Sequence, residues 1–232
     1  FEFIARHHFA KLDGITIPEN LNGKYFKVKN GVLTDITSAG QSYLAGQGRN
    51  GVLVLPSSIT RIDNSVFTQR FQNFKAIYAE GVTEVGSFAF NETGSLNFAH
   101  LPKLKKLGEA VFTDNASLTA VNFPLLEEIG DVCFSGGANF SGNGLKITYV
   151  SIPAAKKIGS GAFHGNYKHS GVTFILGAQP EVNTKAYEDY PQEGFVAFGQ
   201  LKSPVLYVTP EHLKTYTLTD GKWHGFTVKE LK

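Results

Sequence analysis

A glycine-rich segment is the part of this chain whose residue types and spacing most resemble cofactor chemistry. Gly46-Gln-Gly-Arg-Asn-Gly51 fits the G-x-G-x-x-G pattern of dinucleotide-binding loops. Such a loop holds a pyrophosphate where it follows a strand and opens a helix, because its backbone amides and the helix dipole must face the phosphates. Here the segment precedes the strand-like run Val52–Leu55, and no helical pattern follows. We therefore predict a turn and no bound cofactor.

Other residues that could act in catalysis or bind a metal stand alone in the sequence. Cys133 is the only cysteine, so it has no partner for an internal disulfide and could be a nucleophile only with a distant histidine. The seven histidines include no H-E-x-x-H motif and no i, i+4 pair. Glu127 and Glu128 are adjacent, and nothing gives either a reason to be buried for acid–base work. We expect no metal site and no enzymatic activity.

The elements that would position any site follow a repeat. Five times an aliphatic residue is followed five positions later by phenylalanine, in the pairs Ile62/Phe67, Val85/Phe90, Leu107/Phe112, Ile129/Phe134 and Ile158/Phe163. These pairs recur at steps of 23, 22, 22 and 29 residues. A fixed period of this length indicates a solenoid built from stacked copies of one short unit.

Each unit reads as a short strand followed by turns. Leu118, Val121 and Phe123 precede Pro124 with L-x-x-L-x-L spacing, and two other units have the same spacing before a proline. This spacing is typical of a leucine-rich repeat, in which a strand points alternate residues into the core and proline ends the strand. An aliphatic-Gly step follows, and glycine there indicates either a positive φ or a close backbone approach.

Two residue types with possible chemistry fall at fixed repeat positions. The residue before each repeat phenylalanine is small or branched and apolar: Val66, Ala89, Val111, Cys133 and Ala162. Cys133 is therefore predicted to be an inert core residue. Glycosylation sequons start at Asn91, Asn115 and Asn139. They fall in the turn after the phenylalanine, which favours Asn and Ser anyway, so we interpret them as turn residues unless the host is eukaryotic.

The predicted fold is a strand-rich, right-handed α/β leucine-rich-repeat solenoid with one short parallel strand per repeat of about 22 residues. Residues 1–49 are expected to form an N-terminal cap, residues 50–190 about five full repeats plus a degenerate sixth, and residues 191–232 a C-terminal cap. The caps are expected because open solenoid ends expose apolar faces. Together the three segments should form one continuous elongated domain.

Composition narrows the possible partners and compartments. The net charge of +2 offers no basic footprint for nucleic acid. No run of 18 apolar residues exists, so no transmembrane segment is expected. The chain starts at Phe1 and contains no methionine, which suggests that a leader has been removed.

The units Ile158-Gly-Ser-Gly-Ala-Phe163 and Leu107-Gly-Glu-Ala-Val-Phe112 resemble those of the BspA-like, treponemal-type leucine-rich-repeat surface proteins. The closing segment Leu206–Tyr216, followed by Trp223 and Phe226, resembles the C-terminal cap of such arrays. The resemblance covers roughly residues 50–230. It implies a surface-exposed or secreted bacterial protein with an adhesive or host-contact role. It implies no catalytic residues and no cofactor.

Strand alternation predicts which side chains face outward. Leu53, Ile77, Ala99, Val121 and Val150 should point inward. One outward row is then Val54, Tyr78, His100, Asn122 and Ser151, and its neighbour is Val52, Ala76, Phe98, Ala120 and Tyr149. The candidate ligand-binding residues are Tyr78, Phe98, His100, Asn122 and Tyr149, because aromatic rings contribute large contact area at low entropic cost. These rings could equally cover an exposed sheet or pack beneath a loop.

Two functional hypotheses remain open at this point. The first is a monomeric, non-enzymatic recognition or adhesion module that binds a protein or glycan, possibly from a host's extracellular surface, through its strand face. The second is a structural spacer or assembly subunit with no ligand of its own. A rival binding site is the Gly/Ser/Asn-rich loop Ser135–Lys146, which contains Phe140.

Overall fold

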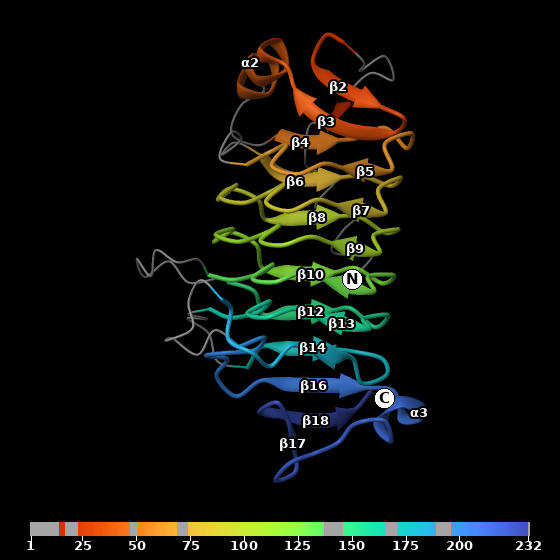
Figure 1. The fold of residues 1–232 in the computed structure, drawn as a ribbon, viewed down its shortest axis with the longest axis vertical. Helices are drawn as coiled ribbons and strands as arrows, with labels where there is room; N and C mark the ends of the chain where they lie inside the picture. The colour runs from red at the N-terminus through yellow and green to blue at the C-terminus, as the bar shows by residue number, and fades with distance from the viewer. Residues whose placement is uncertain are drawn as a thin grey trace.

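The computed structural model describes residues 14–16, 23–46, 51–68, 74–136, 146–165, 171–188 and 196–231. The chain winds into an elongated stack of coils with an N-terminal hairpin at one end and a C-terminal hairpin at the other (Figure 1). No helix within these ranges is long and apolar enough to cross a membrane. The leucine-rich-repeat solenoid predicted from the sequence is confirmed.

Parallel strands form two columns along the stack (Figure 1). The first column contains β1 (Gly14–Thr16), β4 (Gly51–Val54), β6 (Phe74–Tyr78), β8 (Phe98–His100), β10 (Ala120–Asn122), β12 (Tyr149–Ser151), β14 (Thr173–Ile175), β16 (Val205–Val208) and β18 (Phe226–Glu230). The second contains β2 (Phe26–Lys29), β3 (Val32–Ile36), β5 (Arg61–Ile62), β7 (Glu84–Val85), β9 (Lys106–Leu107), β11 (Glu128–Ile129), β13 (Lys157–Ile158) and β15 (Glu181–Val182). The remaining elements are α2 (Ser38–Gly46), α3 (Pro210–Leu213) and β17 (Lys222–Trp223).

The first strand column contains the strands that the L-x-x-L-x-L spacing predicts. The residues expected to face inward, such as Ile77 and Val121, are 2% and 1% exposed. The second column was not predicted. Each of its repeat strands is only two residues long and ends at the repeat aliphatic residue. Two residues are too few to show the alternation by which a strand is recognised in a sequence.

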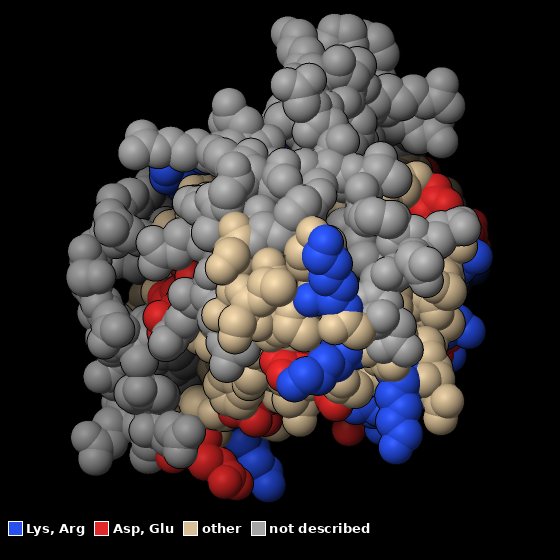
Figure 2. Space-filling view, turned by 90° about the horizontal axis from the view of Figure 1, so that it is seen from above, with Lys and Arg blue, Asp and Glu red and all other residues tan. Residues whose placement is uncertain are grey.

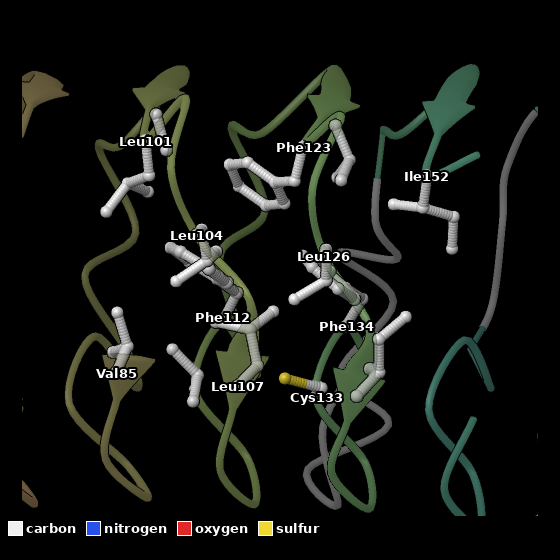
Figure 3. Packing of buried hydrophobic residues seen from close by; sticks show 14 of the residues in the cluster. Val85, Leu101, Leu104, Leu107, Phe112, Phe123, Leu126, Cys133, Phe134 and Ile152 are labelled. Atoms are coloured by element: carbon white, nitrogen blue, oxygen red, sulfur yellow. The ribbon is translucent and has the colours of Figure 1, made fainter. Parts of the chain in front are cut away.

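A stack of phenylalanine rings runs through the core. Its members are Phe67, Phe90, Phe112, Phe134, Phe163 and Phe198, with successive centroids 5.0, 5.5, 5.4, 5.1 and 5.9 Å apart and nearly parallel planes. Figure 3 shows Phe112 and Phe134 at equivalent places in neighbouring coils. Phe198 extends the series because Phe163 N–H donates to Ala197 O, as Phe134 N–H donates to Ala162 O one coil earlier.

The repeat glycines are required by close approach between coils. A Cβ built on Gly130 would lie 2.3 Å from the carbonyl oxygen of Gly108, and one on Gly108 would lie 2.6 Å from the amide of Ser87. Gly86 and Gly159 meet the preceding coil in the same way. None of the four has a positive φ, so the close approach of the backbones, and not a left-handed conformation, explains these glycines.

The two ends of the stack are closed by hairpins. At the N-terminal end β2 and β3 pair antiparallel through a turn at Asn30 (φ 50°) and Gly31 (φ 76°), and β3 continues the second strand column. At the C-terminal end β18 continues the first column and β17 folds back against it. The glycine-rich segment lies between α2 and β4, which is the reverse of the strand–turn–helix order of a dinucleotide site; its residues 47–50 lie outside the described residues.

The outward side chains of the second strand column alternate in charge. In order along the sheet they are Arg61, Glu84, Lys106, Glu128, Lys157 and Glu181, and we call this row the charge ladder. Ion pairs join Arg61 to Glu84 at 3.8 Å and Lys106 to Glu128 at 3.3 Å. Basic and acidic groups are also intermixed on the face seen from the N-terminal end (Figure 2).

Candidate functional site

The aromatic side chains predicted to face outward form a compact stack on two adjacent strands. Tyr78 on β6 is in register with His100 on β8, and their rings stack with centroids 4.6 Å apart and planes 9° apart. Phe98, two residues before His100 and on the same face, lies 6.4 Å from it at 16°. We call these three rings the aromatic stack. All three rings are partly buried, so their packing restricts their orientation while part of each ring stays exposed to solvent.

Glu80 fixes the chemistry of this stack. The Tyr78 hydroxyl donates a hydrogen bond to Oε1 of Glu80. That hydrogen bond, reinforced by burial and by the carboxylate charge, raises the pKa of Tyr78 to about 12. Burial lowers the pKa of His100, and the charge of Glu80 opposes this only in part. At neutral pH the stack therefore presents a neutral phenol and a neutral imidazole beside one carboxylate.

Asn122 and Tyr149 lie farther along the first strand column. β8 and β10 belong to different sheets, so the ladder is interrupted between His100 and Asn122. Tyr149 is in register with Ala120, whose small side chain separates it from the aromatic stack. The five candidate residues therefore share one face of the solenoid, but only Tyr78, Phe98 and His100 form a cluster.

One residue of the predicted outward rows is covered. Ala76 is in register with Phe98 but is only 2% exposed, contrary to the expectation for an outward position. It lies outside the main core cluster, so the difference does not come from an inverted strand. A methyl group beside a large ring in register is shielded because the ring extends well beyond it.

The strand face continues beyond the predicted residues. Ser151, Ile175 and Tyr207 are in register on β12, β14 and β16. Lys229 on β18 is in register with Tyr207, and its ammonium lies 6.0 Å from the centre of that ring. The sequence analysis placed a degenerate sixth repeat and the C-terminal cap here but did not extend the outward rows into them. The rows could have been extended by applying the same alternation.

The other candidate residues have structural roles. Cys133 is fully buried among core side chains (Figure 3), and burial raises the pKa of its thiol to about 12. Asn115, the start of a sequon, is fully buried and hydrogen-bonded to the neighbouring coil. Among the described residues no group of three or more His, Cys, Asp or Glu side chains could hold a metal ion. Of the loop Ser135–Lys146, residues 137–145, with Phe140, lie outside the described residues.

Comparison with known proteins agrees with this architecture. The family model for the BspA type leucine rich repeat region matches residues 49–170 in six copies. The crystal structure of the leucine-rich-repeat protein of T. pallidum is similar with a TM-score of 0.54 and 20% identity, over 89% of this chain and 92% of that one. The pneumococcal vaccine antigen PcpA is similar with a TM-score of 0.56 and 16% identity, over 90% of this chain and 48% of that one. No curated protein shows significant sequence similarity to the chain.

The six matched copies cover the coils from β4 to β13 and include the phenylalanine stack from Phe67 to Phe163, the repeat glycines, the aromatic stack and Tyr149. The two structures share the solenoid over nearly the whole chain. Both lie below 25% identity and so show the fold alone. The chain belongs to the BspA-type leucine-rich-repeat family.

Proposed function

We propose that this protein is a non-enzymatic recognition module that binds a protein or glycan through the strand face formed by Tyr78, Phe98, His100, Asn122 and Tyr149. The observation that carries the proposal is the aromatic stack, in which the rings of Tyr78 and His100 lie 4.6 Å apart on paired strands. Surfaces of this kind bind well because the rings supply contact area and are already ordered before the partner arrives.

The chemistry of the face suits a neutral or weakly basic partner surface. Tyr78 and Glu80 supply a hydroxyl and a carboxylate, while His100 is uncharged at neutral pH because its burial lowers its pKa. Rings can stack on a sugar or on a planar side chain, and the carboxylate can accept hydrogen bonds from either. Asn122 and Tyr149 would widen the contact along the stack.

A location at the cell surface or outside the cell is part of the proposal. Leucine-rich-repeat solenoids commonly serve as protein-interaction scaffolds, and one protein of similar fold is described as a vaccine antigen. Since fold does not fix function, the similarity supports an extracellular role without naming a ligand.

The test is binding of the purified chain to a panel of extracellular-matrix proteins and glycans. It is run beside a variant in which Tyr78, Phe98, His100 and Tyr149 are all alanine. A matched control carries Lys106→Ala and Glu128→Ala on the charge ladder of the other strand column. We expect binding by the wild type and the control, and loss of binding in the folded strand-face variant.

Two results would contradict the proposal. Binding retained by the strand-face variant would place the site elsewhere, with the Ser135–Lys146 loop next in line. Failure of every form to bind, together with association in a light-scattering concentration series, would favour a spacer or assembly subunit.

A further inference from the structure

A pocket of about 720 Å³ lies in the C-terminal cap, several coils beyond the aromatic stack. It is bounded by the turn before β15 and by the β17–β18 hairpin with its preceding turn. Polar groups line it: Gln179, Thr217, Thr219, Asp220, Lys222 and His224. None of these residues belongs to the repeat pattern, so packing of the coils does not explain their grouping.

Trp223 forms the base of the pocket and carries a buried donor with no partner. Its side chain is 2% exposed and packs edge-to-face against Tyr216 at 5.2 Å. The indole Nε1 is buried and makes no hydrogen bond to any described residue. An unpaired buried N–H is costly, so this group needs a water or a ligand atom to complete it.

The walls of the pocket are held in place by hydrogen bonds and tight turns. Oε1 of Gln179 accepts the backbone N–H of Thr217 at 2.7 Å, which joins the two sides. Asp220 (φ 51°) and Gly221 (φ 73°) form one left-handed turn below this contact. The pocket is therefore largely formed before a ligand binds, as is usual for small-molecule sites.

His224 is placed in the pocket at a conformational cost. It adopts φ 43° in the turn with Gly225, a position that favours Asn, Asp or Gly. Its ring lies 4.7 Å from that of Trp223 at 86°. Burial lowers the pKa of His224, so the imidazole is neutral at physiological pH.

The charges of the wall select the class of ligand. Asp220 and Lys222 have opposite charges, so the pocket has no net charge with which to attract an anion or a cation. The threonine hydroxyls, the glutamine amide and the imidazole supply both donors and acceptors. This mixture matches a neutral molecule with many hydroxyl groups.

We propose that the C-terminal cap pocket binds a neutral sugar ring through Thr217, Thr219, Asp220 and His224, with Trp223 beneath it. The proposal concerns a second site and does not depend on ligand binding by the strand face.

Trp223 is the only tryptophan, so its fluorescence reports on this pocket alone. The experiment titrates the whole chain with the methyl pyranosides of glucose, galactose, mannose, fucose and the N-acetylhexosamines. We expect a saturable change in intensity or wavelength with at least one of these probes.

The discriminating variant is Thr217→Val with Thr219→Val, which removes two hydroxyls at nearly constant volume. We expect this variant to bind the responding sugar about tenfold or more weakly, because the hydroxyls of the sugar ring lose their hydrogen-bond partners. The double variant Lys106→Ala with Glu128→Ala on the charge ladder is the matched control and should leave the titration unchanged, because neither residue lies in the cap pocket or on the strand face.

Three results would overturn the sugar site. They are no response to any of the pyranosides, an unchanged response in the folded double-valine variant, and a saturable response to inorganic phosphate instead of sugars.

Discussion

Asn115 joins two neighbouring coils through a fully buried side chain. Its amide nitrogen donates to the carbonyl of Phe90 at 2.8 Å, and its Oδ1 accepts the hydroxyl of Thr93 at 2.6 Å. We predict that Asn115→Ala lowers the free energy of unfolding by about 1–3 kcal/mol, because the buried Phe90 carbonyl and Thr93 hydroxyl each lose a hydrogen bond and keep only the one between them. Urea unfolding measures the change.

Asn91→Ala is the matched control for this prediction. Asn91 is only partly buried, and its amide lies 3.5 Å from the carbonyl of Thr113. We expect it to cost well under half as much as Asn115→Ala. Equal losses in the free energy of unfolding would mean that the buried Thr93–Asn115 hydrogen bonds stabilise the fold no more than the partly exposed contact of Asn91.

The thiol of Cys133 should be unreactive in the folded protein. Burial raises its pKa to about 12, and its Sγ lies 3.4 Å from the carbonyl of Gly108. We predict that a disulfide reagent at about pH 8 labels the thiol only as fast as the chain opens, since the thiolate is the reactive form. Rapid stoichiometric labelling without denaturant would refute the packing.

Two substitutions of Cys133 should separate the effect of side-chain volume on stability from the effect of side-chain polarity. Cys133→Ala should cost roughly 1 kcal/mol or less, because Ala89 and Ala162 occupy the same position in other coils. Cys133→Ser should cost more than the alanine variant, since it buries a hydroxyl with a stronger need for hydrogen bonds. Thermal melts of the two variants give the comparison.

The phenylalanine stack is the element that holds successive coils together. Phe112 is fully buried and contacts Phe90 and Phe134 at 5.5 and 5.4 Å. We predict that Phe112→Ala destabilises the chain by about 3–5 kcal/mol, from lost burial and a residual cavity. A melting temperature equal to that of the wild type would show that this ring does not carry the packing.

A left-handed residue recurs in five coils, three positions after the repeat aliphatic residue. The residues there are Ser65, Phe88, Ala110, Val132 and Gly161, with φ between 47° and 60°. Phe88 is 39% exposed, so its ring is only partly buried in return for this conformation. We predict that Phe88→Gly stabilises the chain by about 0.5–1 kcal/mol, because glycine adopts this φ without steric cost.

Gly130→Ala is the contrasting change in the same type of turn. The added Cβ would sit 2.3 Å from a backbone oxygen of the preceding coil, so the coils must separate. A clear loss of stability is expected, against the gain for Phe88→Gly, in the same urea titration. A loss of stability in Phe88→Gly would show that the Phe88 ring makes a contact that outweighs its backbone strain.

The sequence was sufficient for those parts of the fold that repeat. The aliphatic–phenylalanine pairs and the L-x-x-L-x-L spacing predict the core and the first strand column, because burial imposes the same residue types on every coil. The second column and Phe198 were missed, since two-residue strands lack alternation and Phe198 follows Val182 at a different spacing. At the site, alternation placed Tyr78, Phe98 and His100 on one face, but the role of Glu80 depends on a side-chain hydrogen bond that no spacing predicts.

At the scale of the whole molecule, each coil pairs with the coils before and after it, as in a one-dimensional array. The charge ladder adds a constraint with a period of two coils, because Glu84, Lys106 and Glu128 alternate along the sheet. A chain lengthened by one coil therefore differs from a chain lengthened by two.

Duplicating residues 103–124 adds one coil and places Lys106 beside a copy of itself. Duplicating residues 81–124 adds two coils and keeps the alternation, since each Lys106 then lies between two glutamates. We predict that both chains fold as longer solenoids, because each new seam joins coils that share the repeat's core residues, and that the urea m-value rises with the added buried surface.

The one-coil chain should be less stable per added coil, by roughly 0.5 kcal/mol for the like-charged neighbours. The deficit should shrink at high salt, because exposed charges are screened. Urea titrations of both chains at low and high ionic strength make the comparison. A deficit that does not respond to salt would mean that the seam between duplicated coils, and not the charge ladder, limits how this stack can grow.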